Sequence, residues 1–380
     1  MIKIKFKRYS AFILSLLLIV CLAACGSSGT VSNTPATNES QSAQDTTSDP
    51  AVIMKVTISH QPYSHGLPSY IAEKEGDFTA NGLDAKILWF TSGPAQNEAL
   101  GADEWSVGAM GSPPSIAGGV AYNSRVIAFS VDDTASCDFW VRPDSDIAQI
   151  SGQVPDAPEI MGNADTWRGK TILCPTATSS HFMLIATLEK LGLTEDDVQI
   201  IHMDVPQAYT AFKAGQGDIV SLWDPQSFTA ADEGWIKVSS GPATGEVMPT
   251  VIVASEKAIN ENPDVVYRWL KTYFETCDKY RDNVQGQADY LKEMQLENGI
   301  QVDDDLAYKF VAKRPLPSLQ EQKELFSGEY GSRRVDAIME NVIDFFVAQG
   351  RYEPADKEKL VANGFIDSQF IDRLCEEYGI

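Results

Sequence analysis

Short strand-like and helix-like segments alternate along most of the chain, and this alternation constrains the fold more than any other feature. It predicts an α/β fold in which a mostly parallel sheet is covered by helices on both faces. The first set of segments has strands expected at 52–58, 85–90, 105–109 and 126–129 and helices at 67–75, 96–100 and 114–123.

A second set of the same kind follows a loop at residues 144–166 that is rich in Pro, Gly and Asp. Its expected strands are 170–173, 199–202 and 219–222, and its expected helices are 181–191 and 208–214. Residues 139–141 lead out of the first set and residues 250–254 lead back, which predicts two crossings that form a hinge. We therefore expect a first lobe at 51–143, a second lobe at 144–249, and a return to the first lobe over 250–380.

Beyond residue 255 the apolar spacing becomes helical. Asn262-Pro263-Asp264 predicts a helix start, because Asn caps helices, Pro suits the first helical position and an acid is favoured by the helix dipole. The apolar residues that follow predict one buried stripe, made of Val266, Trp269, Leu270, Tyr273 and Phe274. Further C-terminal helices are expected at 289–297, 304–312, 335–348 and 367–377.

The N-terminal segment has the features of a secretory signal. Four basic residues precede an apolar run at 11–22, which leads into Leu22-Ala23-Ala24-Cys25. The stretch 11–24 would span about 21 Å as a helix, against roughly 30 Å for a bilayer core, which disfavours a transmembrane helix. The last four residues resemble the bacterial lipobox, and this resemblance implies that residues 1–24 are removed and that Cys25 becomes the lipidated first residue.

The mature protein would then be extracytoplasmic and lipid-anchored to the bacterial cell membrane. Residues 25–50 are rich in Ser, Thr, Gln and Asn, a composition typical of a flexible tether. Loss of residues 1–24 removes four positive and no negative charges, so the formal charge falls from −23 to −27. A charge of this sign repels phosphate backbones, which excludes nucleic acid as a partner.

Four cysteines follow the signal and Cys25, namely Cys137, Cys174, Cys277 and Cys375. Three disulfide pairings are open, and the sequence does not choose among them. The cysteines lack the C-x-x-C spacing of a zinc or redox site. We therefore expect buried thiols rather than a disulfide framework.

Common catalytic motifs are missing from the sequence. The chain has no G-x-S-x-G, no H-E-x-x-H and no G-x-x-x-x-G-K-[ST], and no G-x-G-x-x-G follows a strand. Ser179-Ser180-His181 places hydroxyls beside an imidazole, but chain neighbours are rarely a nucleophile and its base. We therefore expect a binding protein with no catalytic residue, cofactor or metal.

Three loops have the composition of anion-binding sites. They are Thr91-Ser92-Gly93-Pro94, Gly111-Ser112-Pro113-Pro114 and Thr176-Ala177-Thr178-Ser179-Ser180. Each follows an expected strand and opens an expected helix, where unpaired backbone N–H groups and the helix dipole favour negative groups. Ordinary helix capping explains any one of these loops, but three of them distributed over both lobes favour a shared ligand cleft.

An ordered series of short motifs resembles the nitrate/sulfonate/taurine group of substrate-binding proteins that serve ABC importers. The motifs are residues 72–78, 81–85, 92–94, 98–100 and 111–114, followed in the second lobe by 167–171, 188–193, 196–198, 207–215 and 217–218. The resemblance implies a two-lobed, type II periplasmic-binding-protein fold with a helical C-terminal region. It also implies hinge closure on a small solute, which is then delivered to the permease subunits of the transporter.

The nature of the ligand depends on residues at the mouth of the expected cleft. Asp224 precedes a proline and is either a turn residue or the partner of a ligand amine, and the second role favours a taurine-like zwitterion over nitrate. Tyr63, Trp140, Trp223 and Phe228 either pack in the core or form an aromatic wall. The full set of candidate ligand-binding residues is His60, Tyr63, His65, Ser92, Gly93, Gly111, Ser112, Pro113, Thr176, Thr178, Ser179, Ser180, His181 and Asp224.

Two alternatives to a sulfonate ligand stay open at the level of sequence. A pyrimidine-like heterocycle could stack on the aromatic residues, since relatives with the same fold handle such compounds. The enzymatic branch of those relatives uses a clustered cysteine motif that this chain lacks. The less favoured alternative is a metal-binding lipoprotein that uses His60, His65, His181 and a carboxylate.

Overall fold

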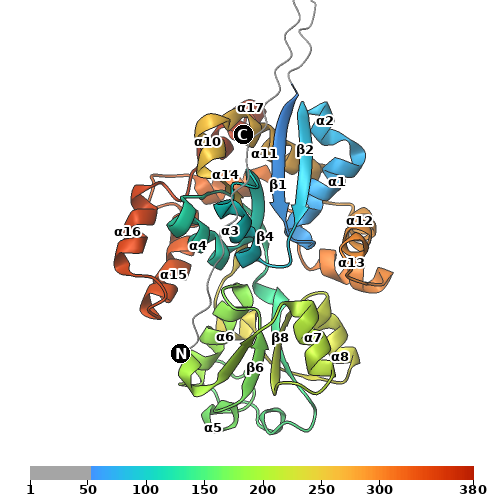
Figure 1. Ribbon diagram of the computed structural model, residues 1–380, viewed down its shortest axis with the longest axis vertical. Helices are drawn as coiled ribbons and strands as arrows, with labels where there is room; N and C mark the ends of the chain where they lie inside the picture. Colours follow the sequence, from blue (N-terminus) through green and yellow to red (C-terminus); the bar gives the residue numbers. More distant parts are fainter. Residues whose placement is uncertain (1–52) are drawn as a thin grey trace, which may run out of the picture. The chain divides into compact units, whose positions relative to one another are not determined.

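Two five-stranded sheets organise residues 53–380, which are the residues that the computed structural model describes (Figure 1). The expected signal at 1–24, the lipidated Cys25 and the tether at 25–50 lie outside the described residues. Within 53–380, no helix is both long enough and apolar enough to cross a membrane.

The first sheet has the strand order β2-β1-β3-β10-β4. β1 is parallel to both of its neighbours, whereas β10 runs antiparallel between β3 and β4. The elements of this first lobe are β1 (Met54–His60), α1 (Leu67–Glu75), α2 (Asp77–Ala80), β2 (Leu83–Trp89), α3 (Gly93–Gly101), β3 (Val107–Gly111), α4 (Ser112–Tyr122), β4 (Arg125–Asp132) and β10 (Pro249–Ala254). The predicted strand and helix order of the first lobe is therefore confirmed.

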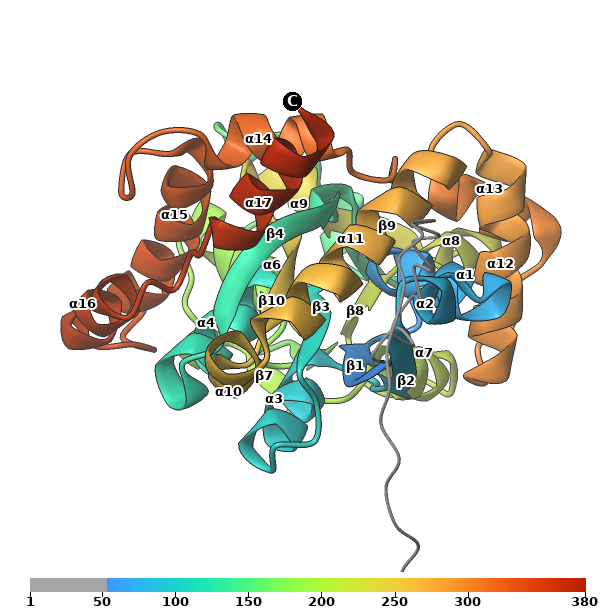
Figure 2. The same ribbon diagram turned by 90° about the horizontal axis from the view of Figure 1, so that it is seen from above.

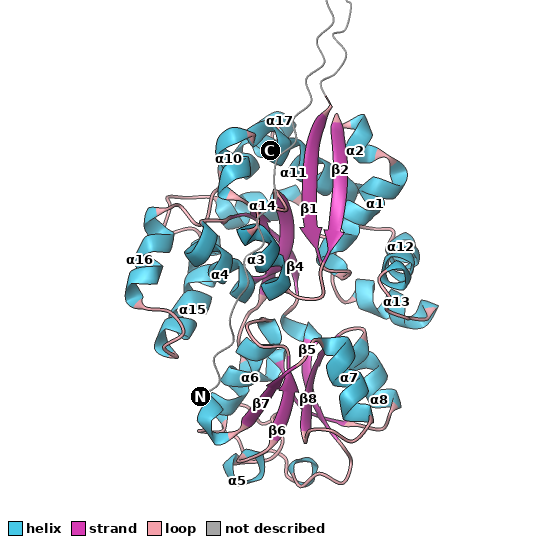
Figure 3. Cartoon of the chain, viewed as in Figure 1, coloured by secondary structure: helices cyan, strands magenta, loops and turns pink. Residues whose placement is uncertain are grey.

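The second sheet has the order β7-β6-β8-β5-β9. Its elements are β5 (Cys137–Val141), α5 (Ala164–Trp167), β6 (Thr171–Cys174), α6 (Ser179–Lys190), β7 (Gln199–His202), α7 (Val205–Lys213), β8 (Ile219–Trp223), α8 (Gln226–Asp232), β9 (Ile236–Ser240) and α9 (Gly241–Thr244). Successive side chains of its strands join different cores: Ile172 lies in the core with α6, and Leu173 lies in the core with α7. Helices therefore cover both faces, as the buried strands require (Figure 3).

The boundary between the lobes differs from the prediction. Residues 139–141 were expected to close the first lobe, but β5 pairs antiparallel with β8 and β9 in the second sheet. Along the chain, the two crossings therefore lie just before β5, at 133–136, and just after α9, at 245–248. An apolar strand such as Cys137–Val141 suits the centre of either sheet, so its composition could not assign it to one of them.

Eight helices form the C-terminal region of the described chain. They are α10 (Glu256–Glu261), α11 (Pro263–Tyr280), α12 (Val284–Glu297), α13 (Asp304–Ala312), α14 (Leu319–Phe326), α15 (Arg334–Ala348), α16 (Pro354–Ala362) and α17 (Gln369–Tyr378). α11 begins at the expected Pro263, buries the whole predicted stripe and lies along α1 and the first sheet (Figure 2). α10, α14 and α16 were not predicted.

The C-terminal helices do not contact the first lobe alone. The rings of Phe345 in α15 and Phe182 in α6 have centroids 4.3 Å apart. Asn341 also donates a hydrogen bond to Glu246 at 3.2 Å, beside the second crossing. The region is thus a third connection between the two lobes, in addition to the two crossings.

All four described cysteines are buried and unpaired, which confirms the expectation of thiols. Burial raises the pKa of the Cys137 thiol to about 12, with Ser180 and Ser136 partly opposing that shift. A thiol with such a pKa is not a nucleophile at neutral pH.

Candidate functional site

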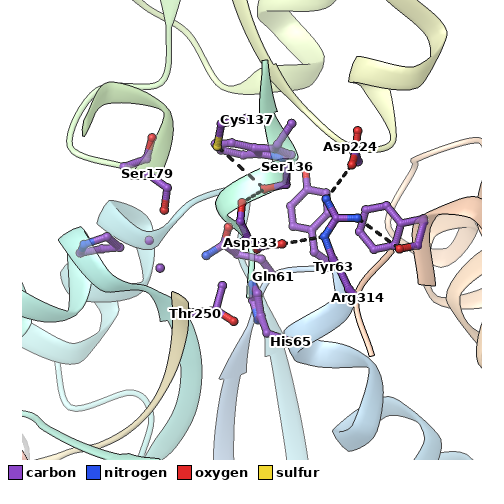
Figure 4. Close-up of a pocket in the computed structure, with 16 residues that line it drawn as sticks. Gln61, Tyr63, His65, Asp133, Ser136, Cys137, Ser179, Asp224, Thr250 and Arg314 are labelled. Carbon is purple, nitrogen blue, oxygen red and sulfur yellow. Dashed lines mark hydrogen bonds and ion pairs between the residues drawn. The ribbon is translucent and has the colours of Figure 1, made fainter. Parts of the chain in front are cut away.

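A small cavity lies between the two lobes (Figure 4). It is bordered by both sheets, the first crossing and the segment that follows α13. Its lining consists of Gln61, Tyr63, His65, Gly93, Gly111, Pro114, Asp133, Ser136, Cys137, Thr178, Ser179, Trp223, Asp224, Thr250, Phe310 and Arg314. This is where the carboxyl ends of strands in α/β sheets usually hold a ligand.

Three helices begin at this cavity, as the three loop sequences predict. α3, α4 and α6 follow Ser92, Gly111 and Thr178, which have extended backbones; Ser92 and Thr178 make no capping hydrogen bond, and Gly111 has no side chain to make one. The helix starts are in close contact. A Cβ atom at Gly93 would lie 2.4 Å from Pro114 Cγ, and one at Gly111 would lie 2.5 Å from Ser179 Oγ across the two lobes.

The three helix starts are unequal as hydrogen-bond donors. Prolines occupy the second position of α3 and the second and third positions of α4, and proline has no N–H. The first turn of α6 has no proline, so it presents more backbone donors than the other two helices. Of the three helix starts, that of α6 therefore offers the most backbone N–H groups to an anion.

The hydroxyl groups that were expected to bind the ligand are partly used within the protein. Ser112 Oγ donates to the carbonyl of Pro249, and Thr178 Oγ1 donates to the carbonyl of Pro175 at 2.6 Å. Ser180 Oγ lies 3.7 Å from Cys137 Sγ. Backbone N–H groups, rather than these hydroxyls, are thus the main donors available to an anion.

The structure brings only part of the predicted set to the cavity. The predicted residues that line it are Tyr63, His65, Gly93, Gly111, Thr178, Ser179 and Asp224. The predicted residues outside its lining are His60, Ser92, Ser112, Pro113, Thr176, Ser180 and His181. The motifs correctly located the helix starts, but they did not reveal which side chain of each loop points inward.

The histidines do not converge as a metal site would require. His60 bonds Ser69 Oγ through Nε2 at 2.8 Å and lies behind His65, with ring centroids 6.1 Å apart. His181 instead lies beside Glu195 in the second lobe. Across residues 53–380, no cluster of three His, Cys, Asp or Glu side chains is placed to hold a metal ion.

Burial keeps the two histidines of the first lobe uncharged. Desolvation lowers the pKa of His65 to about 3. Desolvation, and then the neighbouring His65, lower the pKa of His60 well below its ordinary value. The first lobe therefore presents an uncharged imidazole to the cavity at neutral pH.

Three charged groups meet on the other side of the cavity, of which Arg314 and Asp224 are buried and Asp133 is half-buried (Figure 4). Arg314 donates from Nε to Asp133 at 2.7 Å and from Nη2 to Asp224 Oδ2 at 2.6 Å. Burial lowers the pKa of Arg314, but the two carboxylates outweigh this effect, so that its pKa is raised. Lys313 also contacts Asp224 Oδ2, at 3.3 Å.

Asp224 is therefore more than a turn residue, but its charge is already paired. Its side chain is fully buried, and Oδ1 has no hydrogen-bond partner among the described residues. Asp133 and Arg314 were missed at the sequence level. They lie 181 residues apart in the chain, and no local motif marks either of them.

Two aromatic side chains of the lining contact each other. Tyr63 and Trp223 both line the cavity, with their rings edge to face and their centroids 5.8 Å apart. Desolvation raises the pKa of Tyr63 to about 12, so its hydroxyl stays protonated. Trp140 packs instead in the core with α7, and the ring of Phe228 lies 5.2 Å from Lys313 Nζ.

Sequence comparisons agree with this architecture. The profile of the NMT1/THI5-like family matches residues 158–280. A putative ABC transporter periplasmic binding protein of Brachyspira hyodysenteriae is 32% identical, over 89% of this chain and 91% of the relative. A putative aliphatic sulfonates-binding protein of Bacillus subtilis is 25% identical, over 82% of this chain and 86% of the relative.

Solved structures show the same fold. The periplasmic aliphatic sulphonate binding protein SsuA of Escherichia coli superposes with a TM-score of 0.60 at 18% identity, over 79% of this chain and 94% of that protein. The chain belongs to the periplasmic binding proteins of ABC transporters. Its relatives are binding proteins, which confirms the prediction of a solute-binding component rather than an enzyme.

Proposed function

We propose that the protein captures a small organic sulfonate in the cavity between its lobes and delivers it to the permease of an ABC importer. The observation that carries this proposal is the meeting of three helix starts without side-chain caps at one cavity. A sulfonate has three oxygens that accept hydrogen bonds, so it can use N–H donors from more than one helix. The names of the sulfonate-binding relatives support the same ligand class.

The opposite side of the cavity suits a ligand that also carries an amine. Asp224 Oδ1 is a buried acceptor without a partner, and a buried acceptor of this kind is costly unless it is hydrogen-bonded. A ligand ammonium would satisfy it near Tyr63 and Trp223, which also line the cavity. A taurine-like aminosulfonate therefore fits the cavity better than nitrate does.

Closure around the ligand is part of this proposal. The cavity takes its lining from both lobes, and Gly111 and Ser179 approach each other across them. Two crossings at 133–136 and 245–248 provide the hinge. Small-angle scattering should show a smaller radius of gyration with saturating sulfonate, and an unchanged radius despite binding would contradict closure.

The lipid anchor is proposed from the sequence alone. Residues 22–25 resemble a lipobox, and residues 25–50 have the composition of a tether. Two acyl chains hold a protein at a membrane where one would be marginal. Cys25→Ala should therefore release the protein from the membrane fraction or block its processing, whereas a variant that stays there fully processed would refute the anchor.

Calorimetry tests the ligand class directly. We expect taurine and ethanesulfonate to bind, and nitrate and uracil to bind at least tenfold more weakly, about 1.4 kcal/mol. Tighter binding of uracil than of either sulfonate would replace this proposal with the heterocycle alternative. Failure of all four ligands to bind would overturn the sulfonate assignment.

A further inference from the structure

Two histidines of the second lobe hold the backbone that leads into α6. The N–H of Thr176 donates to His202 Nδ1 at 3.1 Å, and the N–H of Ala177 donates to His181 Nδ1 at 3.1 Å. Thr178 and Ser179, which line the cavity, follow directly. The conformation of this short segment therefore decides where the first N–H groups of α6 point.

Ala177 has a backbone conformation that alanine rarely adopts. Its φ is 59°, in the left-handed region that the Cβ atom of any residue except glycine disfavours. Such a conformation persists only where neighbouring groups enforce it. The hydrogen bond from the Ala177 N–H to His181 Nδ1 is a side-chain contact that can hold Ala177 in this conformation.

The other ring nitrogen of His181 is fixed as well. Nε2 lies 2.6 Å from Glu195 Oε1, and Arg351 contacts the second oxygen of the same carboxylate. Because Nδ1 accepts a hydrogen bond, the ring proton belongs on Nε2, which donates to Glu195. The hydrogen bond with His181, aided by Arg351 and partly opposed by burial, lowers the pKa of Glu195 to about 2.

We infer that His181 is a positioning residue for ligand binding, which holds Ala177 in its left-handed conformation and so directs the α6 amides into the cavity. The inference rests on the proposed function of that helix start as an anion site. It also corrects the expectation that His181 touches the ligand, because its side chain is 5% exposed and lies outside the cavity lining. Its ring instead donates to Glu195 through Nε2 and accepts a hydrogen bond from the Ala177 N–H through Nδ1.

Two conservative variants separate the functions of the two ring nitrogens. Asparagine in His181→Asn places an oxygen near the position of Nδ1 and can still accept from Ala177. Glutamine in His181→Gln reaches the position of Nε2, keeps a donor for Glu195 and loses the Nδ1 acceptor. By calorimetry with ethanesulfonate, we expect about a tenfold loss of affinity in His181→Gln and a loss below about threefold in His181→Asn.

A second substitution distinguishes positioning from a general effect on folding. Glycine adopts the left-handed conformation without steric cost, so Ala177→Gly should restore most of the affinity that His181→Gln loses. A residue that only stabilised the core would not be rescued in this way, because glycine adds chain entropy to the unfolded state. Equal affinities of His181→Gln and the native protein, or no rescue by Ala177→Gly, would overturn the inference.

A measurement without ligand keeps this inference separate from the proposed function. Hydrogen exchange of the amides at 177–180 should be faster in His181→Gln than in His181→Asn, even in the ligand-free protein. If no sulfonate binds the native protein but this difference is seen, the ligand assignment fails while the positioning role stands. Equal exchange rates in both variants would refute the positioning role itself.

Discussion

The two sides of the cavity are built on different physical principles. The side from the first lobe consists of uncharged residues, including Gln61, His65, Gly93 and Pro114. The other side carries charged groups that are paired with one another. It is formed by the second lobe, the first crossing and the segment at the end of α13. Under the proposed function, both sides contribute helix starts to the anion site, and the charged side would in addition select a ligand that carries an amine.

Removal of Arg314 should give the largest effect, because it breaks the pairing on the charged side. Arg314→Met leaves two carboxylates near each other with only Lys313 in contact with one of them. Breaking a buried ion pair in this way costs about 3 to 5 kcal/mol of unfolding free energy. Urea unfolding measures this loss.

Arg168→Met is the matched control for this prediction. Arg168 pairs with Asp197, but its side chain is 54% exposed, so its removal should cost less than about 1 kcal/mol. Similar losses of unfolding free energy in the two variants would show that the buried ion pairs stabilise the fold no more than an exposed pair does.

Asp224→Asn tests whether the charged side selects the ligand. The variant should weaken binding of taurine by about 1.5 to 3 kcal/mol, the range for hydrogen bonds to charged groups. Ethanesulfonate has no amine and should bind nearly as well as before. Calorimetry with both ligands decides the question, and equal changes for the two would remove Asp224 from the amine site.

The uncharged side should instead respond to changes of volume. Gly93→Ala places a Cβ against the rigid ring of Pro114, and overpacking of this kind costs about 1 to 3 kcal/mol of stability. Binding of taurine and ethanesulfonate should weaken equally, since shape rather than charge is altered. Thermal unfolding and calorimetry measure the two effects.

Gly101→Ala, at the other end of α3, is the control. Its Cβ would meet the ring of Tyr122, which is 42% exposed and free to move away. The change in stability should stay within about 0.5 kcal/mol. A ligand-specific loss in Gly93→Ala would contradict a role in shape alone.

The effect that is smallest at neutral pH, and that grows only in acid, concerns the uncharged imidazole of His65. The unfolded chain takes up a proton below about pH 6.5, whereas the folded protein does so only near pH 3. Stability is therefore full above pH 6.5 and falls as the pH drops through this window, by about 1.4 kcal/mol per pH unit. His65→Gln should reduce the slope of stability against pH by one proton, and an unchanged slope would show that His65 is not buried as a neutral ring.

Local signals account for what the sequence could predict. Strand alternation and the Ser, Gly and Pro residues before each helix located α3, α4 and α6, because those signals act over a few neighbouring residues. The Asp133–Arg314–Asp224 group joins segments separated by 90 residues or more, and the pairing leaves no local pattern. The lining of the cavity was therefore half predictable, with the uncharged loops found and most of the charged side missed.

The inward or outward direction of a side chain was also beyond the sequence. Ser179 and Ser180 are neighbours of the same type, yet Ser179 lines the cavity and Ser180 contacts Cys137. Both serines belong to the first turn of α6, where successive side chains point about 100° apart, so the direction of each depends on how the helix is set against the cavity. The left-handed conformation of Ala177 was not predictable either, because propensity scales assign it to glycine and rarely to alanine.

The contact of Phe345 with Phe182 would restrict the hinge motion proposed above. A body joined to another at two neighbouring strands swings freely about the line through them, but a third point of attachment away from that line removes this freedom. An opening motion that keeps the two rings in contact must rotate about an axis that passes close to them. The lobes would then separate mainly at the edge of the cavity away from this contact, rather than along its whole length.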